Sequence, residues 1–531
     1  MNEEAVKKLT EQGCMVGSDA AQKLTMRDVE MIKEFDTTPM YVSAGMVESL
    51  REKVGQKQVV KTDGTVEVES DTSDADISEG SINDQGEGMG TDQESSEDEV
   101  DEGLYRRRSS NFSADKTVEL RDTGRRETNR TKVEILDEAE ITKQEKDVPE
   151  FLSYYNDRYE RMRKLLTRRT RLQAATTIKR LDRKDEGDQA ATVGLVKSKY
   201  STSSGKWIVE LEDKTGVFKA LVDEREGEMI VPDEVIGVQG SMGGDIIYAD
   251  SVVRPDLPIP QGDTASVEDE VYAAYISDLH MGSVDTLTER LNRFGDWLAT
   301  DEASKVGYLV IAGDLVEGVG IYPGQEDELR VNDIYKQYEL FEDWVDRIPE
   351  DVQIIIGPGN HDITRLSEPQ PRISEDAFTR IHEYDNVHRV QNPQMVRLHG
   401  IEGKGVKHLL YHGYSFDDHV DRIQELRENA YDEPDRVMID LLKRRHLAPT
   451  YGSNMLSPED KDHMVIEEKP DVMVSGHFHS HAVSSYKGVN VICSSTFQAQ
   501  TDFQKRVGHE PDPGKVTLMN LKTRKTEVKQ F

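Results

Sequence analysis

Five apolar segments in the C-terminal half of the sequence each run directly into a short polar cluster. The segments cover residues 271–276, 308–311, 352–356, 408–411 and 471–474. Continuous apolar runs of this length are typical of strands that are covered on both faces, as in α/β proteins. Polar residues at the carboxyl ends of such strands converge on one crevice. The pattern therefore predicts an α/β domain over residues 268–531 with a ligand site at the strand ends.

The polar clusters supply nitrogen and oxygen ligands and no sulfur. Seven candidate metal ligands follow the strands: Asp278, His280, Asp314, Asn360, His412, His477 and His479. Seven is about the number needed to hold two divalent ions that share one carboxylate and keep open positions for water and substrate. Imidazole ligands favour manganese, iron, zinc or cobalt over magnesium or calcium. We expect two divalent ions, manganese first, with zinc, iron or magnesium as alternatives.

Each of these short motifs is common when taken alone, and only their order along the chain is informative. Other histidines stand outside the strand-end clusters and are expected to be structural or solvated: His382, His388, His399, His446 and His463.

The ordered set of motifs resembles the calcineurin-like metallophosphoesterase superfamily. It consists of Asp278-x-His280, Gly313-Asp314, Gly359-Asn360-His361-Asp362, His412-Gly413 and Gly476-His477-x-His479. The resemblance implies a first metal on Asp278, His280, Asp314 and His479. It implies a second metal on Asp314, Asn360, His412 and His477.

The same resemblance implies roles for two residues that are not metal ligands. His361 would contact the phosphate and help to protonate the leaving oxygen, and Asp362 would orient His361. Gly313-Asp314 continues as Leu315-Val316-Glu317-Gly318, without the Asp-Arg-Gly that is typical of Ser/Thr protein phosphatases. A protein phosphatase is therefore not expected.

Residues 174–262 switch from long apolar runs to short strands separated by glycine-containing turns. Strands are expected at 192–196, 206–213, 215–222, 235–240 and 246–249. Five strands in a segment of this length fit a small closed barrel such as the OB-fold. The aromatic residues available for stacking on nucleic acid are Tyr200, Trp207 and Phe218. A DNA-binding barrel and a structural or subunit-docking barrel both remain open.

The N-terminal part of the chain is expected to contain three segments. Residues 1–50 are predicted to form a small helical module, since Thr25 to Asp28 has capping-box spacing and apolar residues follow at helical intervals. Residues 51–145 are predicted to be an acidic disordered linker, because 63–102 contains sixteen acidic residues and no Lys or Arg. Residues 146–173 are predicted to be a basic helix that leads into the barrel.

The basic helix carries a dense row of cationic side chains: Arg158, Arg161, Arg163, Lys164, Arg168, Arg169 and Arg171. A solvated face is the expected interpretation, although the excess stands out in so acidic a chain.

The chain has a formal charge of −36, which leaves −36 + 16 = −20 outside residues 63–102. Such a charge argues against a free-standing binder of DNA or of a membrane surface. It suits a proteome at high salt, where screening shortens the Debye length to about 3 Å at 1 M. Two distant cysteines, Cys14 and Cys493, exclude a disulfide framework and a cysteine-type zinc site. Because no apolar run approaches the roughly 20 residues of a membrane helix, we expect a cytoplasmic protein.

A narrower resemblance covers nearly the whole chain apart from the linker. The segments that carry it are Tyr155-x-x-Arg158-Tyr159, residues 367–371, residues 494–501 and Phe503-Gln504-Lys505. Together with the domain order, they resemble the small subunits of archaeal family D DNA polymerases. That resemblance implies a 3′→5′ exonuclease in a two-subunit replicative polymerase. It also implies that the partner is a large catalytic subunit and that the substrate is single-stranded or primer-template DNA.

Two other functions stay open at this point: a non-catalytic polymerase accessory scaffold, and a stand-alone metal-dependent phosphodiesterase. The intact ligand set favours an active nuclease over the scaffold. The barrel and the N-terminal segments, which a small substrate would not need, disfavour the stand-alone enzyme.

Overall fold

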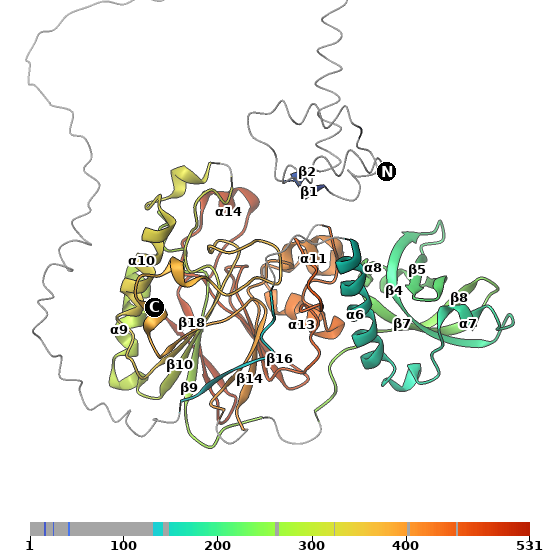
Figure 1. The fold of residues 1–531 in the computed structure, drawn as a ribbon, viewed down its shortest axis with the longest axis horizontal. Helices are drawn as coiled ribbons and strands as arrows, with labels where there is room; N and C mark the ends of the chain where they lie inside the picture. Colours follow the sequence, from blue (N-terminus) through green and yellow to red (C-terminus); the bar gives the residue numbers. More distant parts are fainter. Residues whose placement is uncertain are drawn as a thin grey trace, which may run out of the picture. The chain divides into compact units, whose positions relative to one another are not determined.

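The computed structural model describes residues 15–16, 25, 41–42, 131–141, 148–260, 265–322, 324–400, 404–452 and 455–531 (Figure 1). The chain divides into two compact units, Met1–Asp122 and Thr123–Phe531. In the first unit, β1 (Met15–Val16) pairs in parallel with β2 (Tyr41–Val42). The helix predicted after Thr25 and the acidic residues 63–102 lie outside the described residues.

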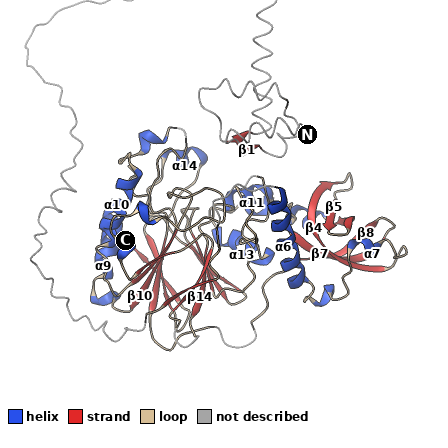
Figure 2. Ribbon diagram, in the orientation of Figure 1, coloured by secondary structure: helices blue, strands red, loops and turns tan. Residues whose placement is uncertain are grey.

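The C-terminal part of the second unit contains two six-stranded sheets with helices on their outer sides (Figures 1 and 2). The first sheet has the order β12 (Val387–Arg389), β11 (Gln353–Gly357), β10 (Val306–Ala312), β9 (Tyr272–Ile276), β18 (Lys515–Asn520), β19 (Thr526–Gln530). The second has the order β16 (Ala482–Tyr486), β17 (Val489–Cys493), β15 (Val472–Ser475), β14 (Val406–Leu410), β13 (Gln394–Leu398), β3 (Val133–Leu136). The five predicted apolar segments are thus parallel strands divided between two sheets, β9, β10 and β11 in one and β14 and β15 in the other.

Strand β10 shows why these segments are apolar throughout, since all seven of its residues are buried. Leu309 and Ile311 pack with the helices outside the first sheet. Tyr308 and Val310 point the other way and pack with residues of the second sheet. Because successive side chains of a strand face opposite sides, a strand covered on both faces must be apolar at every position.

Helices cover the outer face of each sheet. On the first sheet these are α9 (Thr288–Leu298) and α10 (Ile334–Val345). On the second they are α11 (Phe416–Arg422) and α13 (Pro434–Arg444). Two shorter helices are α12 (Gln424–Arg427) and α14 (Asp502–Val507).

The five-stranded barrel predicted upstream is present and closed. Its order is β4 (Gln189–Ser201), β5 (Trp207–Asp213), β6 (Gly216–Val222), β8 (Ile246–Val253), β7 (Val235–Met242) and back to β4. Two short helices pack on it, α7 (Ile178–Leu181) and α8 (Glu224–Met229). The interior is a cluster of aliphatic side chains with Phe218, so this barrel is filled rather than hollow.

One part of the predicted linker was assigned wrongly. Residues 51–145 include β3, which pairs antiparallel with β13 at the edge of the second sheet. Ile135 lies opposite Val396, more than 250 residues further along the chain. Four residues carry too little local pattern to predict a strand, and here the partner strand supplies the hydrogen bonds.

The solvated-face interpretation of the basic helix is wrong for its central arginine. Helix α6 (Val148–Leu166) lies between the barrel and the two-sheet domain (Figure 1). Arg158 is 1% exposed, and its Nε lies 2.5 Å from Oδ2 of Asp462. Arg161 reaches the carbonyl of Asp462. These arginines therefore attach α6 to the two-sheet domain.

A set of buried charges surrounds this attachment, and we call it the junction cluster. Its members are Arg158, Glu234, Asp440, Arg444, His446 and Asp462. Arg444 lies 2.5 Å from Glu234 of the barrel side and 2.6 Å from Asp440 of α13. The cluster thus joins the barrel to the two-sheet domain through paired ions.

No helix in the described part of the chain has the length and apolarity needed to span a membrane.

Candidate metal centre

The carboxyl ends of strands from both sheets meet at one place in the two-sheet domain. Asp278 and His280 follow β9, Asp314 follows β10, and Asn360 follows β11 of the first sheet. The second sheet contributes its ligands from the loops after β14 and β15: His412, His477 and His479. The convergence predicted from the sequence therefore joins the edges of two sheets.

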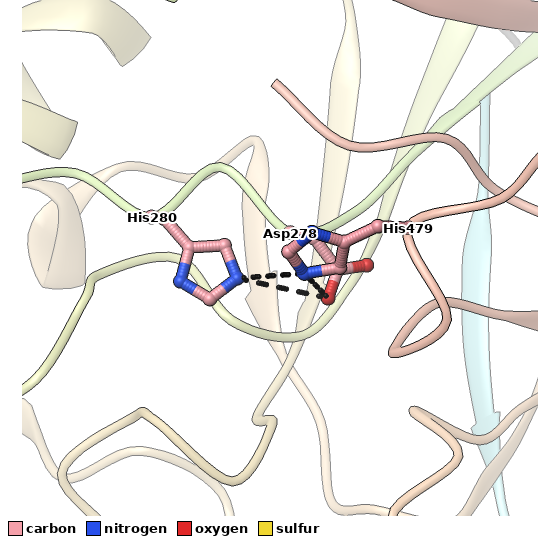
Figure 3. Close-up of side chains that lie close together, drawn as sticks. All are labelled: Asp278, His280 and His479. Atoms are coloured by element: carbon pink, nitrogen blue, oxygen red, sulfur yellow. Dashed lines mark hydrogen bonds and ion pairs between the residues drawn. The ribbon is translucent and has the colours of Figure 1, made fainter. Parts of the chain in front are cut away.

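Three of the predicted ligands form a tight group (Figure 3). Nε2 of His479 lies 3.4 Å from Oδ1 of Asp278 and 3.1 Å from Nε2 of His280. Nε2 of His280 lies 3.9 Å from the same oxygen of Asp278. All three side chains are buried, and their ligand atoms face one another.

A second group surrounds Asp314. Its Oδ2 lies 3.2 Å from Nε2 of His412 and 3.8 Å from Nε2 of His280, so this carboxylate faces a histidine of each group. Oδ1 of Asn360 lies 3.0 Å from Nε2 of His412. This arrangement suits Asp314 as the shared ligand of two ions.

His477 lies beside the second group, with its ring centroid 5.3 Å from that of His412. Nε2 of His477 faces Oδ2 of Asp417 at 3.1 Å. Because Nε2 is held by this carboxylate, Nδ1 is the ring atom that His477 has left for an ion.

The backbone at the ligands is strained. Five of the seven have positive φ angles: Asp278 (52°), His280 (47°), Asp314 (51°), His477 (73°) and His479 (55°). Such conformations cost of order 1–3 kcal/mol each in residues other than glycine and cluster at functional sites. Left-handed backbone is thus concentrated at the predicted ligands.

Two glycines of the motifs lie so close to a ligand carboxylate that no side chain would fit. A Cβ atom at Gly359 would clash with the side chain of Asp314, and one at Gly476 would clash with that of Asp278. The Gly-Asn and Gly-His pairs of the sequence motifs therefore let neighbouring loops pack against the carboxylates.

Electrostatics at the centre are dominated by buried acids that face imidazoles. Burial favours the neutral carboxyl of Asp314, but His412 and His361 outweigh it and hold the pKa of Asp314 well below its usual value. Burial opposes a charge on His280, but Glu317 and the aspartates raise its pKa to about 9. Asp314 raises the pKa of His412 to about 10 against the effect of burial.

The donor set fits divalent cations. Within the described residues, neither Asp278 nor Asp314 forms an ion pair with Lys or Arg. The imidazoles that face these buried carboxylates balance their charge through raised pKa values, and a bound cation could take the place of the imidazole protons. Imidazole nitrogens and carboxylate oxygens directed at common points are the ligands of manganese, iron or zinc.

Sequence reasoning missed Glu317, which is buried and touches the centre twice. Its Oε2 lies 2.9 Å from Nδ1 of His280 and accepts a hydrogen bond from Gln498 at 2.8 Å. Its carbonyl oxygen lies 2.7 Å from Nδ1 of His361. Glu317 stands three residues after Asp314, where the sequence showed only a departure from the phosphatase pattern. Its position in the same strand-end loop was the available signal.

His361 lies at the centre, but the predicted role of Asp362 is wrong. The carboxylate of Asp362 accepts hydrogen bonds from the backbone N–H of Gly359 at 2.8 Å and from Tyr338 Oη at 2.9 Å. It thereby braces the loop, and burial together with Asp314 raises its pKa to about 7. The group that orients His361 is the carbonyl of Glu317.

Two further contacts to ligand histidines were not predicted. Besides Asp417 at His477, the amide Nε2 of Gln504 in α14 lies 3.0 Å from Nδ1 of His479. Asp417 does not follow a predicted strand. Gln504 lies in the segment Phe503-Gln504-Lys505, which indicated only a family resemblance. Their partners lie 60 and 25 residues away, which local pattern does not indicate.

Comparison with known protein families finds a match within the two-sheet domain. Residues 273–484 match the family model that describes the B subunits of DNA polymerases alpha and epsilon, and this segment contains all seven predicted ligands. This segment is therefore similar to the B subunits of DNA polymerases.

Curated relatives define the family more narrowly. The chain is 40% identical over 384 residues to the DNA polymerase II small subunit of Archaeoglobus fulgidus, which covers 70% of this chain and 75% of the relative. It is 38% identical to the protein of that name from Halobacterium salinarum, over 72% of this chain and 75% of the relative. The chain belongs to the family of archaeal DNA polymerase II small subunits. These proteins are the small subunits of family D DNA polymerases.

Among solved structures, an archaeal phosphodiesterase is similar over 49% of this chain and all of that chain, with 13% identity and a TM-score of 0.24. A TM-score this low does not establish a shared fold.

Proposed function

We propose that this chain is the 3′→5′ exonuclease of its polymerase, hydrolysing phosphodiester bonds at single-stranded or mispaired DNA 3′ ends. The observation that carries the proposal is the centre itself. Two groups of buried imidazoles and carboxylates adjoin there: Asp278 belongs to both, and Asp314 faces His412 of one group and His280 of the other. A scaffold would have no use for strained, buried acids and imidazoles gathered at one point.

Two divalent ions, manganese first, are proposed as the cofactors. Asp278, His280, Asp314 and His479 would hold one ion. Asp314, Asn360, His412 and His477 would hold the other. When bound, such ions supply positive charge to the scissile phosphate and lower the pKa of an attacking water.

His361 is proposed to act on the leaving group. Donation from Nδ1 to the carbonyl of Glu317 at 2.7 Å fixes the ring, so that Nε2 is the atom left to transfer a proton. Its backbone N–H donates to Oδ1 of Asp314 at 2.8 Å, which ties His361 to the shared carboxylate. In the proposed reaction, protonated His361 gives its proton to the departing O3′ as the terminal nucleotide is released.

The flanking architecture is proposed to serve the polymerase assembly. We assign the two-sheet domain to the calcineurin-like metallophosphoesterase fold. We assign the barrel to the OB-fold, because its strands close in the order β4, β5, β6, β8, β7. A large catalytic subunit would polymerise DNA and supply cationic contacts that an acidic chain of charge −36 cannot provide. Association should therefore raise nuclease efficiency.

The test is digestion of an oligonucleotide with a mispaired 3′ end in manganese, by the chain alone and with the large subunit. We expect release of nucleotides from the 3′ end, stronger in the complex and absent after chelation. A correctly folded complex that binds manganese without releasing nucleotides would refute the exonuclease and favour the scaffold.

A further inference from the structure

Helix α14 turns one side toward the metal centre. Its N-cap Thr501 forms a capping box with Gln504, which fixes the start of the helix. From this buried position, the amide of Gln504 lies 3.0 Å from Nδ1 of His479. The backbone N–H of His509, just beyond the helix, donates to the carbonyl of Gln504. The other residues of this short helix therefore lie within one helical turn of Gln504, which contacts the proposed ligand His479.

The other sides of α14 present an aromatic ring and two cations to solvent. Phe503 is 58% exposed, so one face of its ring is open to solvent. Arg506 is exposed three residues later and thus shares a face with Phe503. Lys505 is exposed as well, and its ion pair with Asp502 is a surface pair that restrains it little.

A second aromatic ring lies near this helix. Tyr431 is 45% exposed, and its ring centroid lies 4.5 Å from that of His509. The same tyrosine is hydrogen-bonded to Asp417, the partner of His477. Exposed aromatic surface is thus connected to ligands of both proposed ions, to His479 through α14 and to His477 through Asp417.

We propose that α14 is the binding subsite for the single-stranded end of the substrate. Phe503 stacks on a nucleobase, and Arg506 with Lys505 contacts the adjoining phosphate. Aromatic rings combined with cations are the usual means of holding single strands without sequence preference. The subsite rests on the proposed nuclease function and defines its substrate class as an unpaired strand, because bases within a duplex are stacked on both faces and leave none for Phe503.

The cations of α14 are informative because the chain as a whole repels phosphate. Acidic side chains lie nearby, among them Asp285, whose pKa is raised by burial and by neighbouring acids such as Asp502 against the opposing effect of Lys505. In such surroundings, an exposed Phe503 flanked by Lys505 and Arg506 favours a nucleic acid strand over an apolar protein surface.

The experiment compares two substrates of the full-length chain, alone and with the large subunit, in manganese. One is a single-stranded oligonucleotide, and the other is bis(p-nitrophenyl) phosphate, which has neither base nor flanking strand. Base stacking contributes about 1–3 kcal/mol by alanine substitution, which corresponds to about 5- to 150-fold. We expect Phe503→Ala to lower the ratio of oligonucleotide to small-substrate efficiency by that factor, mainly through KM.

Matched variants identify the cause. Phe503→Trp should restore most of the ratio because it restores stacking, and Arg506→Gln should lower the ratio and weaken its salt dependence. Tyr248→Ala removes an aromatic of 49% exposure on the barrel and should leave the ratio unchanged. An equal effect of Tyr248→Ala would overturn the assignment to α14.

Failure of the subsite and failure of the function give different results. If the wild-type complex hydrolyses neither substrate, the proposed nuclease is wrong and the subsite falls with it. If wild type is active and Phe503→Ala keeps its ratio, only the subsite is wrong. If Phe503→Ala instead releases the large subunit and leaves the ratio unchanged, α14 is a protein-docking surface.

Discussion

Buried acids and histidines gather in two regions of this molecule, the metal centre and the junction cluster, and they are neutralised differently. At the junction, Asp462 pairs with Arg158, and Asp440 and Glu234 pair with Arg444. At the centre, Asp278 and Asp314 face imidazoles, with no Lys or Arg paired to them in the described chain. Arg254 also lies 3.5 Å from Glu234, so the junction has one arginine for each of its three acids, whereas the acids of the centre face imidazoles whose protons a cation could replace.

His446 of the junction and His412 of the centre respond in opposite directions, although burial lowers the pKa of His479, which also lies at the centre. Burial and the charge of Arg158 lower the pKa of His446 to about 4 at the junction. At the centre, the carboxylate of Asp314 outweighs burial and raises the pKa of His412 to about 10. Burial alone therefore does not distinguish the two regions. The distinction is that arginines face the acids of the junction, whereas histidines face the acids of the centre.

The largest effect is expected from the residue that both ligand groups share. Asp314→Ala should abolish nuclease turnover while leaving the fold largely intact, because both proposed ions lose their common ligand. Turnover and metal content, measured together on the purified variant, check this. Substantial turnover with two metals still bound would show that the centre does not depend on Asp314.

A smaller loss is expected when the centre keeps its ligands and loses its proton donor. His361→Ala should lower turnover by about 10²–10⁴-fold, the usual contribution of general acid catalysis, with metal content nearly unchanged. If metal content instead falls together with turnover, His361 is a ligand and the division of roles is wrong.

The junction should respond in stability rather than in chemistry. Arg158→Ala leaves Asp462 buried without its cation, and breaking such a pair typically costs about 3–5 kcal/mol. Denaturant unfolding should detect this loss, while Arg168→Ala, which removes an exposed arginine of the same segment, should cost less than about 0.5 kcal/mol. Similar losses for the two variants would remove the distinction between paired and solvated arginines.

The two regions should also set opposite limits of pH stability in the metal-free chain. His446 has a folded pKa below its unfolded value of 6.5, so its contribution is present above pH 6.5 and is lost as the pH falls toward about 4. That shift corresponds to about 3 kcal/mol. His412 has a raised pKa, so its contribution is complete below pH 6.5 and is lost as the pH rises through about 10.

Melting temperatures across this range, in chelator and in manganese, check the pH limits. Manganese should remove the alkaline loss, because an ion takes the place of the histidine protons, and should leave the acid loss in place. Manganese protection confined to the acid side would contradict the contrast between the regions.

The sequence was sufficient for those features whose signal is local. Apolar strands that end in Asp278 or His412, and the short strands of the barrel, are visible in consecutive residues. Contacts between residues far apart in the sequence could not be predicted. Arg158 contacts Asp462, 304 residues further along the chain, and β3 pairs with β13, more than 250 residues further along. Asp362 was misassigned because adjacency to His361 suggested a contact, whereas the turn directs its carboxylate to Gly359 and Tyr338.

The central claim is that the centre holds two divalent ions through one shared carboxylate, and anomalous diffraction from crystals grown in manganese tests it most directly. We predict two peaks about 3.5–4 Å apart, with Asp314 between them, His280 and His479 at one, and His412 at the other. A single peak, or none at manganese concentrations that support full nuclease activity, would contradict the account.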